Sequence, residues 1–128
     1  MKALYHVWFS TKRRQWVLEG EIGDEAKRLF VATAERTRID LMEVEAYGDH
    51  VHLLVAVAKG QTLPSVMHQL KGATARYIFL KYPDLKLDLG HSSFWQKGYG
   101  WRKIAESEVP TIRHYIRTQK ERPPRRNA

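Results

Sequence analysis

The fold is decided by the stretch Asp49-His50-Val51-His52-Leu53-Leu54-Val55, which continues into the apolar residues 56–58. Its length and composition predict a β-strand over 50–58. Because the strand is apolar on both faces beyond His52, it should lie in the middle of a sheet that is covered on both sides. Side chains two apart in a strand point the same way, so His50 and His52 should share one face, while Val51 points into the core.

Strand-like and helix-like segments alternate along the rest of the chain. Thr62 and Ser107 are expected to cap helices, and Pro83 should end the helix that Thr62 begins. Gly48-Asp49 predicts a hairpin turn, and 84–93 is expected to be a loop. Periodicity and composition predict strands over 3–11, 41–47 and 94–97, and helices over 21–37, 62–82 and 107–121.

The resulting order is βαββαβ, followed by a last helix that contains Tyr115. This order predicts an α+β protein with a ferredoxin-like antiparallel sheet and an additional C-terminal helix. Right-handed crossovers place the first and third strands at the centre of such a sheet. The histidine pair would therefore lie on a rigid central strand.

Length and composition indicate one globular domain. The chain has 128 residues, of which 43% are hydrophobic and 28% are charged, and it has no cysteine. Disulfides and thiolate metal sites are therefore excluded. We expect one domain over 1–121 and a solvated basic tail over 122–128. No apolar run is long enough to span a bilayer and no signal-peptide pattern is present, so we expect a cytoplasmic protein with no membrane partner.

The net charge of +8 makes polyanions the natural partners of this surface. On charge alone, a protein that binds a polyanion and a basic soluble protein with no such partner are equally good explanations. Each basic side chain taken singly is better explained as a solvated surface charge, and Trp8 and Trp95 are better explained by burial than by stacking on bases. The candidate contacts to phosphate are Lys12, Arg13, Arg14, Lys71 and Arg76.

Two short motifs could together perform chemistry. Two imidazoles on one strand face could hold one metal ion, although an isolated pair is also explained by two polar residues at the start of a strand. Tyr115 and Gln119 lie one helical turn apart. On periodicity alone, they are a core-edge aromatic and a partly exposed polar residue. Their functional interpretation is a nucleophilic phenol beside an amide ligand.

A metal would serve this chemistry because a free phenol has a pKa near 10 and a phosphodiester repels nucleophiles. A divalent ion offsets that repulsion and orients the phosphorus. His50, His52 and Gln119 would leave coordination positions open for the phosphate. Imidazole, amide and phosphate ligands together favour Mg²⁺ or Mn²⁺, and the sequence does not choose between them.

In combination these motifs resemble the HUH superfamily, and within it the single-tyrosine transposases of the insertion-sequence-200/605 group. The two paired motifs, in this order, are the specific part of the resemblance. The matching segments are Tyr5-His6-Val7-Trp8-Phe9-Ser10-Thr11-Lys12-Arg13-Arg14, Asp49-His50-Val51-His52-Leu53-Leu54, Leu70-Lys71-Gly72-Ala73-Thr74-Ala75-Arg76, Phe94-Trp95-Gln96-Lys97-Gly98-Tyr99-Gly100 and Arg113-His114-Tyr115-Ile116-Arg117-Thr118-Gln119.

The resemblance implies a DNA transposase in which Tyr115 is the nucleophile and His50, His52 and Gln119 bind the metal. It implies cleavage and rejoining of single-stranded DNA at the ends of a mobile element, through a 5′-phosphotyrosine. It also implies recognition of a DNA hairpin near each end by a homodimer, in which the tyrosine helix can serve the partner's histidines.

Other functions remain open at this point. The RNA-recognition motif shares the βαββαβ order, but it needs stacking aromatics on the third strand, and 50–58 has none. A two-histidine phosphoesterase would need two His-x-Ser/Thr motifs, and only His91-Ser92-Ser93 fits. A replication initiator or relaxase with the same metal pair is a third rival. A non-catalytic or domesticated nucleic-acid-binding protein of the same fold is the principal alternative.

Overall fold

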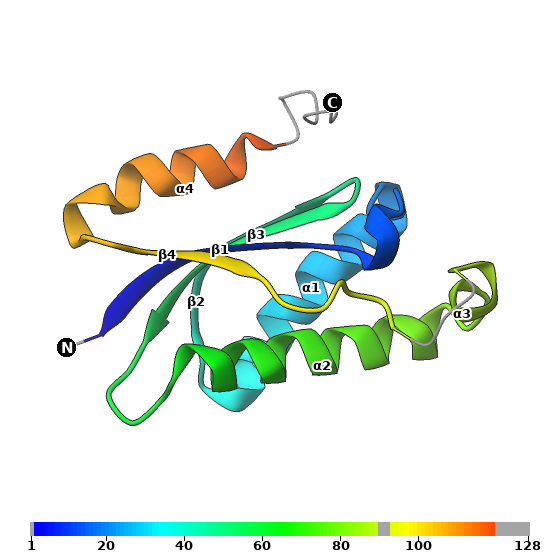
Figure 1. Ribbon diagram of the computed structural model, residues 1–128, viewed down its shortest axis with the longest axis horizontal. Helices are drawn as coiled ribbons and strands as arrows, with labels where there is room; N and C mark the ends of the chain where they lie inside the picture. The colour runs from blue at the N-terminus through cyan, green and yellow to red at the C-terminus, as the bar shows by residue number, and fades with distance from the viewer. Residues whose placement is uncertain (1, 90–92, 120–128) are drawn as a thin grey trace.

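A four-stranded antiparallel sheet lies between helices in the computed structural model, which describes residues 2–89 and 93–119 (Figure 1). The strand order is β2-β3-β1-β4, so the first and third strands are central, as the sequence predicts. The strands are β1 (Ala3–Ser10), β2 (Asp40–Tyr47), β3 (His50–Val57) and β4 (Gly100–Ile104). The helices are α1 (Gly20–Thr37), α2 (Leu63–Lys81), α3 (Asp84–Leu89) and α4 (Val109–Arg117), with 3₁₀ turns η1 (Lys12–Arg14) and η2 (Glu106–Glu108).

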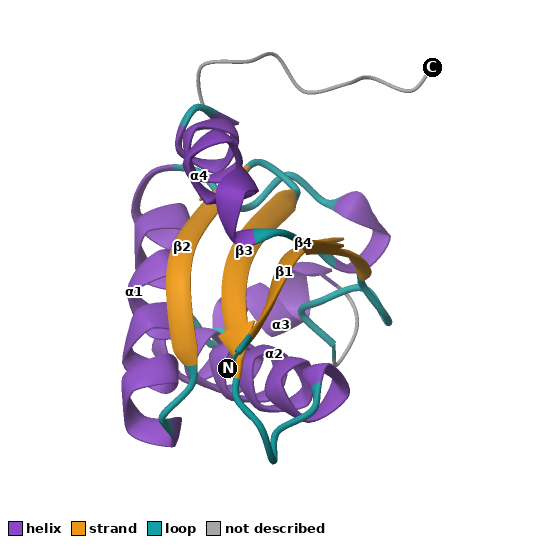
Figure 2. Ribbon diagram, turned by 90° about the vertical axis from the view of Figure 1, so that its left-hand side faces the viewer, coloured by secondary structure: helices purple, strands orange, loops and turns teal. Residues whose placement is uncertain are grey.

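The two faces of the sheet are covered unequally. Helices α1 and α2 pack on one face and α4 lies over the other (Figures 1 and 2). Alternation along β3 sends Val51, Leu53 and Val55 into the large cluster under α1 and α2, and Leu54 into a smaller cluster under α4. Every residue of 51–57 is buried, which confirms the prediction of a strand covered on both sides.

Local sequence signals explain where most elements begin and turn. The Thr62 side chain accepts a hydrogen bond from the backbone N–H of Ser65 at 3.2 Å, so Thr62 caps α2 as expected. The hairpin between β2 and β3 turns at Gly48, whose φ of 65° is in the left-handed region that favours glycine. The ring of Trp16 lies against this glycine and leaves no room for a Cβ atom.

The fourth strand is not where the sequence predicts it. Residues 94–97 contribute only an isolated bridge between Trp95 and Thr11, and β4 follows at 100–104, paired with β1. The aromatic residues that suggest a strand, Phe94 and Trp95, are instead core residues of an irregular segment. The true strand lacks an apolar alternation because it is an exposed, basic edge strand.

Two smaller expectations are also wrong. Residues 84–89 form the short helix α3 rather than a loop, with Leu85 packed against the core. Ser107 lies inside η2 and does not cap α4, which begins at Val109 after Glu108. Glu108 instead accepts a hydrogen bond from the backbone N–H of Ala105 at 2.8 Å. This contact closes the turn that leads into the helix.

Some expectations fall outside the described residues. They are the end of the last helix near 121, the basic tail 122–128 and His91. Among the helices that the structure does describe, none combines the length and the apolar character needed to cross a bilayer.

Candidate active site

The two histidines of β3 point to the face of the sheet that α4 covers. Their rings are nearly parallel, with an interplanar angle of 16° and centroids 6.1 Å apart. His52 is buried, with 9% of its surface exposed, whereas His50 at the strand start is half-buried. The central strand therefore presents two imidazoles on one face, of which His52 is buried and His50 is accessible to solvent.

The His50 ring is oriented by the hairpin residue before it. Its Nδ1 lies 2.6 Å from Oδ1 of Asp49, a contact in which the imidazole N–H donates to the carboxylate. The guanidinium of Arg14 donates to the other carboxylate oxygen at 3.2 Å and approaches Nε2 of His50 at 3.4 Å. Since Nδ1 is engaged by Asp49, Nε2 is the nitrogen that His50 can offer to a cation.

The His52 ring contacts a third histidine, which the sequence interpretation did not single out. Nε2 of His6, on β1, lies 3.1 Å from Nδ1 of His52, and the two rings are stacked with centroids 5.3 Å apart. Burial, together with the nearby positive charge of Arg102, lowers the pKa of His6. In the sequence His6 is a single histidine between Tyr5 and Val7 on a strand expected to be central, and this pattern alone does not indicate a contact with His52.

Tyr115 lies over this histidine row. Its ring stands edge-on to His52, with centroids 5.7 Å apart, and edge-on to His6 at 5.8 Å. The residue remains 41% exposed. Helix α4 holds it there by burying Ile112 and Ile116 against Leu54. Sequence motifs about sixty residues apart are thus brought together within one subunit.

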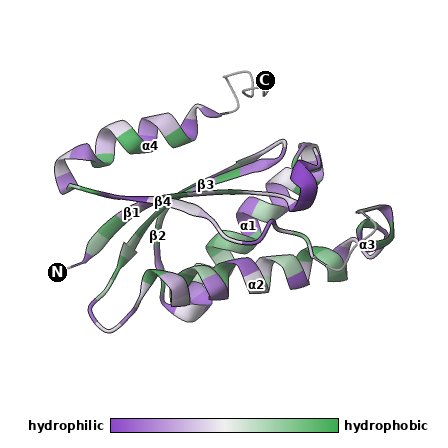
Figure 3. Ribbon diagram, in the orientation of Figure 1, coloured by the Kyte–Doolittle hydropathy of each residue, from purple (hydrophilic) through white to green (hydrophobic). Residues whose placement is uncertain are grey.

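Ion pairs add a second attachment between α4 and the sheet. Arg113 and Arg117 both contact Oε1 of Glu43 on β2, at 3.3 and 3.1 Å. Along α4 apolar and polar residues alternate in bands, as Figure 3 shows in green and purple. The helix is therefore amphipathic, and its buried residues are Ile112 and Ile116.

Gln119 lies just beyond α4, where its amide Nε2 donates to the backbone carbonyl of Tyr115 at 3.1 Å. This hydrogen bond uses the amide nitrogen and leaves the carbonyl oxygen as the group available for a cation. The sequence predicts Gln119 on the helix, one turn after Tyr115, whereas the structure ends α4 at Arg117 and places Gln119 in the residues that follow.

The donor set suits a divalent cation with open coordination positions. In the described part of the chain, no three histidine or carboxylate side chains converge as a complete metal site. Asp49 and His6 contact Nδ1 of His50 and His52, so a cation would be bound through the two Nε2 atoms, and the Arg14 guanidinium approaches the one on His50. Two imidazoles with an amide oxygen from Gln119 would make a three-ligand site that needs the substrate to complete it. These residues fit a metal of the Mg²⁺ or Mn²⁺ type.

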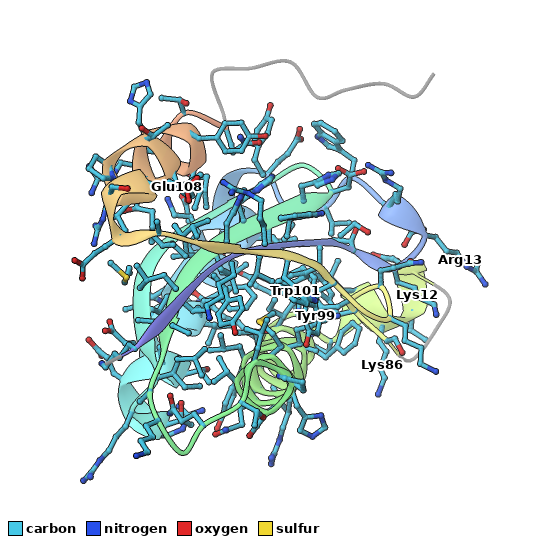
Figure 4. All side chains as sticks on the ribbon, turned by 60° about the vertical axis from the view of Figure 1, so that its left-hand side comes forward. Lys12, Arg13, Lys86, Tyr99, Trp101 and Glu108 are labelled. Atoms are coloured by element: carbon cyan, nitrogen blue, oxygen red, sulfur yellow. The ribbon has the colours of Figure 1, made fainter. Side chains whose placement is uncertain are left out.

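The five basic candidates divide between two regions. Arg14 lines a pocket of about 330 Å³ together with His50 and Trp8. Lys12, Lys71 and Arg76 instead line a larger groove of about 990 Å³ between α2 and the 93–99 segment. Arg13 is exposed and points away from the protein near Lys12, at the opposite end of the molecule from Glu108 (Figure 4).

Lys71 has a structural role in addition to any contact with DNA. Its ammonium group donates to the backbone carbonyls of Gln96 and Gly98, the former at 2.8 Å. Burial lowers the pKa of Lys71. Trp95 is buried and donates from its indole N–H to Thr74 at 3.0 Å, so it belongs to the core, as expected. Trp8 instead faces the pocket beside His50.

Comparison with known proteins decides the family. The family described as "Transposase IS200 like" matches residues 1–119. The chain belongs to the IS200-like transposases. Its curated relatives include the ISDra2 transposase TnpA of Deinococcus radiodurans, which is 34% identical over 115 residues, or 90% of this chain and 82% of that protein. The transposase for the insertion sequence element IS200 of Salmonella typhimurium is 26% identical, over 91% of this chain and 76% of that protein.

Solved structures agree with the assignment. A crystal structure described as that of a transposase from Deinococcus radiodurans R1 is 31% identical, with a TM-score of 0.76 over 93% of this chain and 92% of that chain. A REP-associated tyrosine transposase bound to a REP hairpin has a TM-score of 0.66 at 12% identity, over 94% of this chain and 68% of that chain, and so shares the fold. The α+β fold and the predicted family are confirmed.

Proposed function

We propose that this IS200-like transposase cleaves and rejoins single-stranded DNA at the ends of an insertion sequence through a 5′-phosphotyrosine on Tyr115. The observation that carries the proposal is the packing of the Tyr115 ring against His52, in line with His50. A partly exposed phenol beside two imidazoles places a nucleophile next to a cation site. We further propose that the sheet is the ferredoxin-like arrangement and that 1–121 is one catalytic domain.

In the cleavage step, Oη of Tyr115 bonds to phosphorus while the bond from phosphorus to the 3′ oxygen breaks. The phenolic proton passes to solvent, and the departing 3′ oxygen takes up a proton to become a hydroxyl. Rejoining reverses these events when a 3′ hydroxyl attacks the phosphotyrosine. The ester conserves the energy of the broken bond, so no nucleotide cofactor is needed.

His50, His52 and Gln119 would hold the Mg²⁺ or Mn²⁺. Such an ion, when bound, offsets the charge of the phosphate and orients it for in-line attack. The chain's own groups prepare the site: Asp49 fixes the His50 ring, and α4 aims the phenol at the sheet. Arg14 contacts Asp49 and His50, so its guanidinium would bind the phosphate next to the proposed cation site.

The DNA is proposed to be single-stranded with a hairpin near each element end, bound by a homodimer. Trp8 lines the pocket beside His50 and offers an aromatic face to an unpaired base. Lys12, Lys71 and Arg76 line the larger groove on the far side of the sheet, and Arg13 projects beside it. Contacts of this kind would make binding weaken steeply with salt.

The test is covalent capture. The protein is incubated with single-stranded DNA that carries its own element ends, with Mg²⁺ or Mn²⁺, and resolved on a denaturing gel. We expect a protein–DNA adduct that requires the metal. Tyr115→Phe should abolish the adduct and leave DNA binding near normal, because only the nucleophilic oxygen is lost. Tyr77→Phe, on α2, is the matched control and should react like the unmodified protein.

The outcomes separate the proposals. His50→Ala should abolish the adduct through loss of a metal ligand. An adduct that survives Tyr115→Phe shows that the nucleophile is wrongly assigned. If the unmodified protein binds the DNA but forms no adduct with either Mg²⁺ or Mn²⁺, the result supports the non-catalytic alternative.

A further inference from the structure

His6 is buried at the centre of the site, and nothing in the proposed chemistry uses it. The residue is 8% exposed, on the central strand β1. In the β1–β3 pairing His6 lies opposite Leu54, and Trp8 lies opposite His52. The contact between His6 and His52 is therefore diagonal across the two strands. It joins Nε2 of His6 to Nδ1 of His52 at 3.1 Å.

Only one proton can lie between two ring nitrogens at this distance. A neutral imidazole donates from one nitrogen and accepts at the other. If His52 offers Nε2 to a cation, its proton must be on Nδ1, so His52 donates and His6 accepts. His6 then keeps its own proton on its Nδ1. The opposite assignment would place the proton of His52 on Nε2 and block metal binding there.

We propose that His6 is a positioning residue that holds His52 in the Nδ1–H tautomer and fixes its ring plane, so that Nε2 faces the cation. The inference rests on the proposed role of His52 as a metal ligand. Ligating histidines commonly donate their second N–H to a neighbouring acceptor, and loss of that acceptor weakens metal binding about 10- to 100-fold. Asp49 has the same role for His50, so the two ligands are oriented by different chemistry: a carboxylate for one and an imidazole for the other.

The shape of the contact supports positioning rather than simple packing. The His6 and His52 rings are stacked at 26°, and both stand edge-on to Tyr115. His6 therefore contacts a proposed ligand and the proposed nucleophile at once. A shift of the His52 ring would alter its angle to the phenol as well as to the cation.

The decisive measurement is Mn²⁺ affinity of the metal-free protein, by calorimetry or by electron paramagnetic resonance. His6→Leu keeps an apolar side chain but removes the acceptor, and should weaken Mn²⁺ binding about 10- to 100-fold. His6→Gln places an amide oxygen at similar reach and should restore most of the affinity. His68→Leu removes an exposed histidine on α2 and should change nothing.

A second measurement tests the proposal without a variant, and so still applies if His6→Leu does not fold. Long-range ¹H–¹⁵N correlation spectra of the unmodified, metal-free protein report which nitrogen of His52 is protonated. We expect Nδ1. A proton on Nε2, or His6→Leu with unchanged Mn²⁺ affinity, would overturn the proposal.

His52→Ala distinguishes this failure from failure of the proposed function. If His52→Ala abolishes Mn²⁺ binding and His6→Leu does not, only the positioning role is wrong. If His52→Ala binds Mn²⁺ as tightly as the unmodified protein, His52 is not a ligand, and both proposals fail.

Discussion

Replacing Ile116 by alanine tests whether helix α4 is attached to the sheet independently of the main core. Ile116 is fully buried, in a cluster whose buried members in the described part of the chain are only Leu54, Ile104, Ile112 and Ile116. Removing a buried isoleucine side chain down to alanine costs about 2–5 kcal/mol. A small cluster at the end of a short helix can relax, which favours the lower value of about 2 kcal/mol.

This loss of stability can be measured as faster hydrogen exchange in α4. If α4 opens locally, a loss of about 2 kcal/mol should speed exchange of its backbone amides about 30-fold. The assay is exchange followed by mass spectrometry on peptides that cover 109–117. Thermal or urea unfolding of the same variant should show a loss of stability of the same order, because the unfolded state lacks the same contacts.

The matched comparison is Ile78→Ala. Ile78 is also fully buried, but it lies on α2 in the large cluster of the other face. This change should lower global stability by a similar amount and leave exchange in α4 unchanged, because local opening of α4 does not break the contacts of Ile78. Equal acceleration of α4 in both variants would refute independent attachment and show that the helix opens only when the whole protein unfolds.

Two further predictions concern stability away from the site. Burial raises the pKa of Glu25, but hydrogen bonds and charge from Arg28 and Lys81 outweigh it and lower the pKa overall. The ion pairs should thus stabilise the fold at neutral pH and cease to do so as pH falls through the folded-state pKa. Urea unfolding should therefore show Glu25→Gln destabilised at pH 7, by an amount that shrinks progressively as pH falls below the ordinary pKa of a glutamate; a pH-independent difference would contradict this account. Thr62→Ala removes the cap on Ser65 and should cost about 1 kcal/mol, or about 4 °C in Tm; an unchanged Tm would show that solvent caps this helix equally well.

The central strand was predictable because its signal is local and redundant. Residues 50–58 combine length, apolar composition and a strong turn signal at Gly48, and each indicates the same structure. Placing Tyr115 near the histidines required topology as well. The order of elements fixes β3 at the centre, and the amphipathic pattern of α4 requires a partner surface, which the open face of the sheet provides.

The fourth strand was not predictable by the same reasoning. Burial of Phe94 and Trp95 gives 94–97 the composition of a strand, but tertiary packing rather than pairing is what buries them. The strand at 100–104 contains an exposed Trp101 between Gly100 and Arg102, which resembles a surface loop in sequence. Edge strands are specified by the strand they pair with, and that information is not local.

The role of His6 was hidden for a different reason. A single histidine in an apolar strand is unremarkable, and its meaning depends on the diagonal contact with His52, 46 positions away. That contact needs the register of β1 against β3, which places Trp8 opposite His52. Register follows from the whole pattern of buried faces, so a one-residue slip would turn His6 toward the opposite face.

Because the two faces of the sheet are covered unequally, the histidines and Tyr115 are held in place with different strength. The histidines belong to a central strand whose far side supports the large core, so their positions change only if that core opens. The tyrosine belongs to a short helix attached by two isoleucines and by ion pairs to Glu43, which are partly exposed and contribute little. Regions with few buried contacts open at the lowest free energy. In the proposed function, a rigid cation site beneath a weakly attached nucleophile would let a strand of DNA enter between them without disturbing the metal ligands, because the ligands are on the strand backed by the large core and the phenol is on the helix that is not.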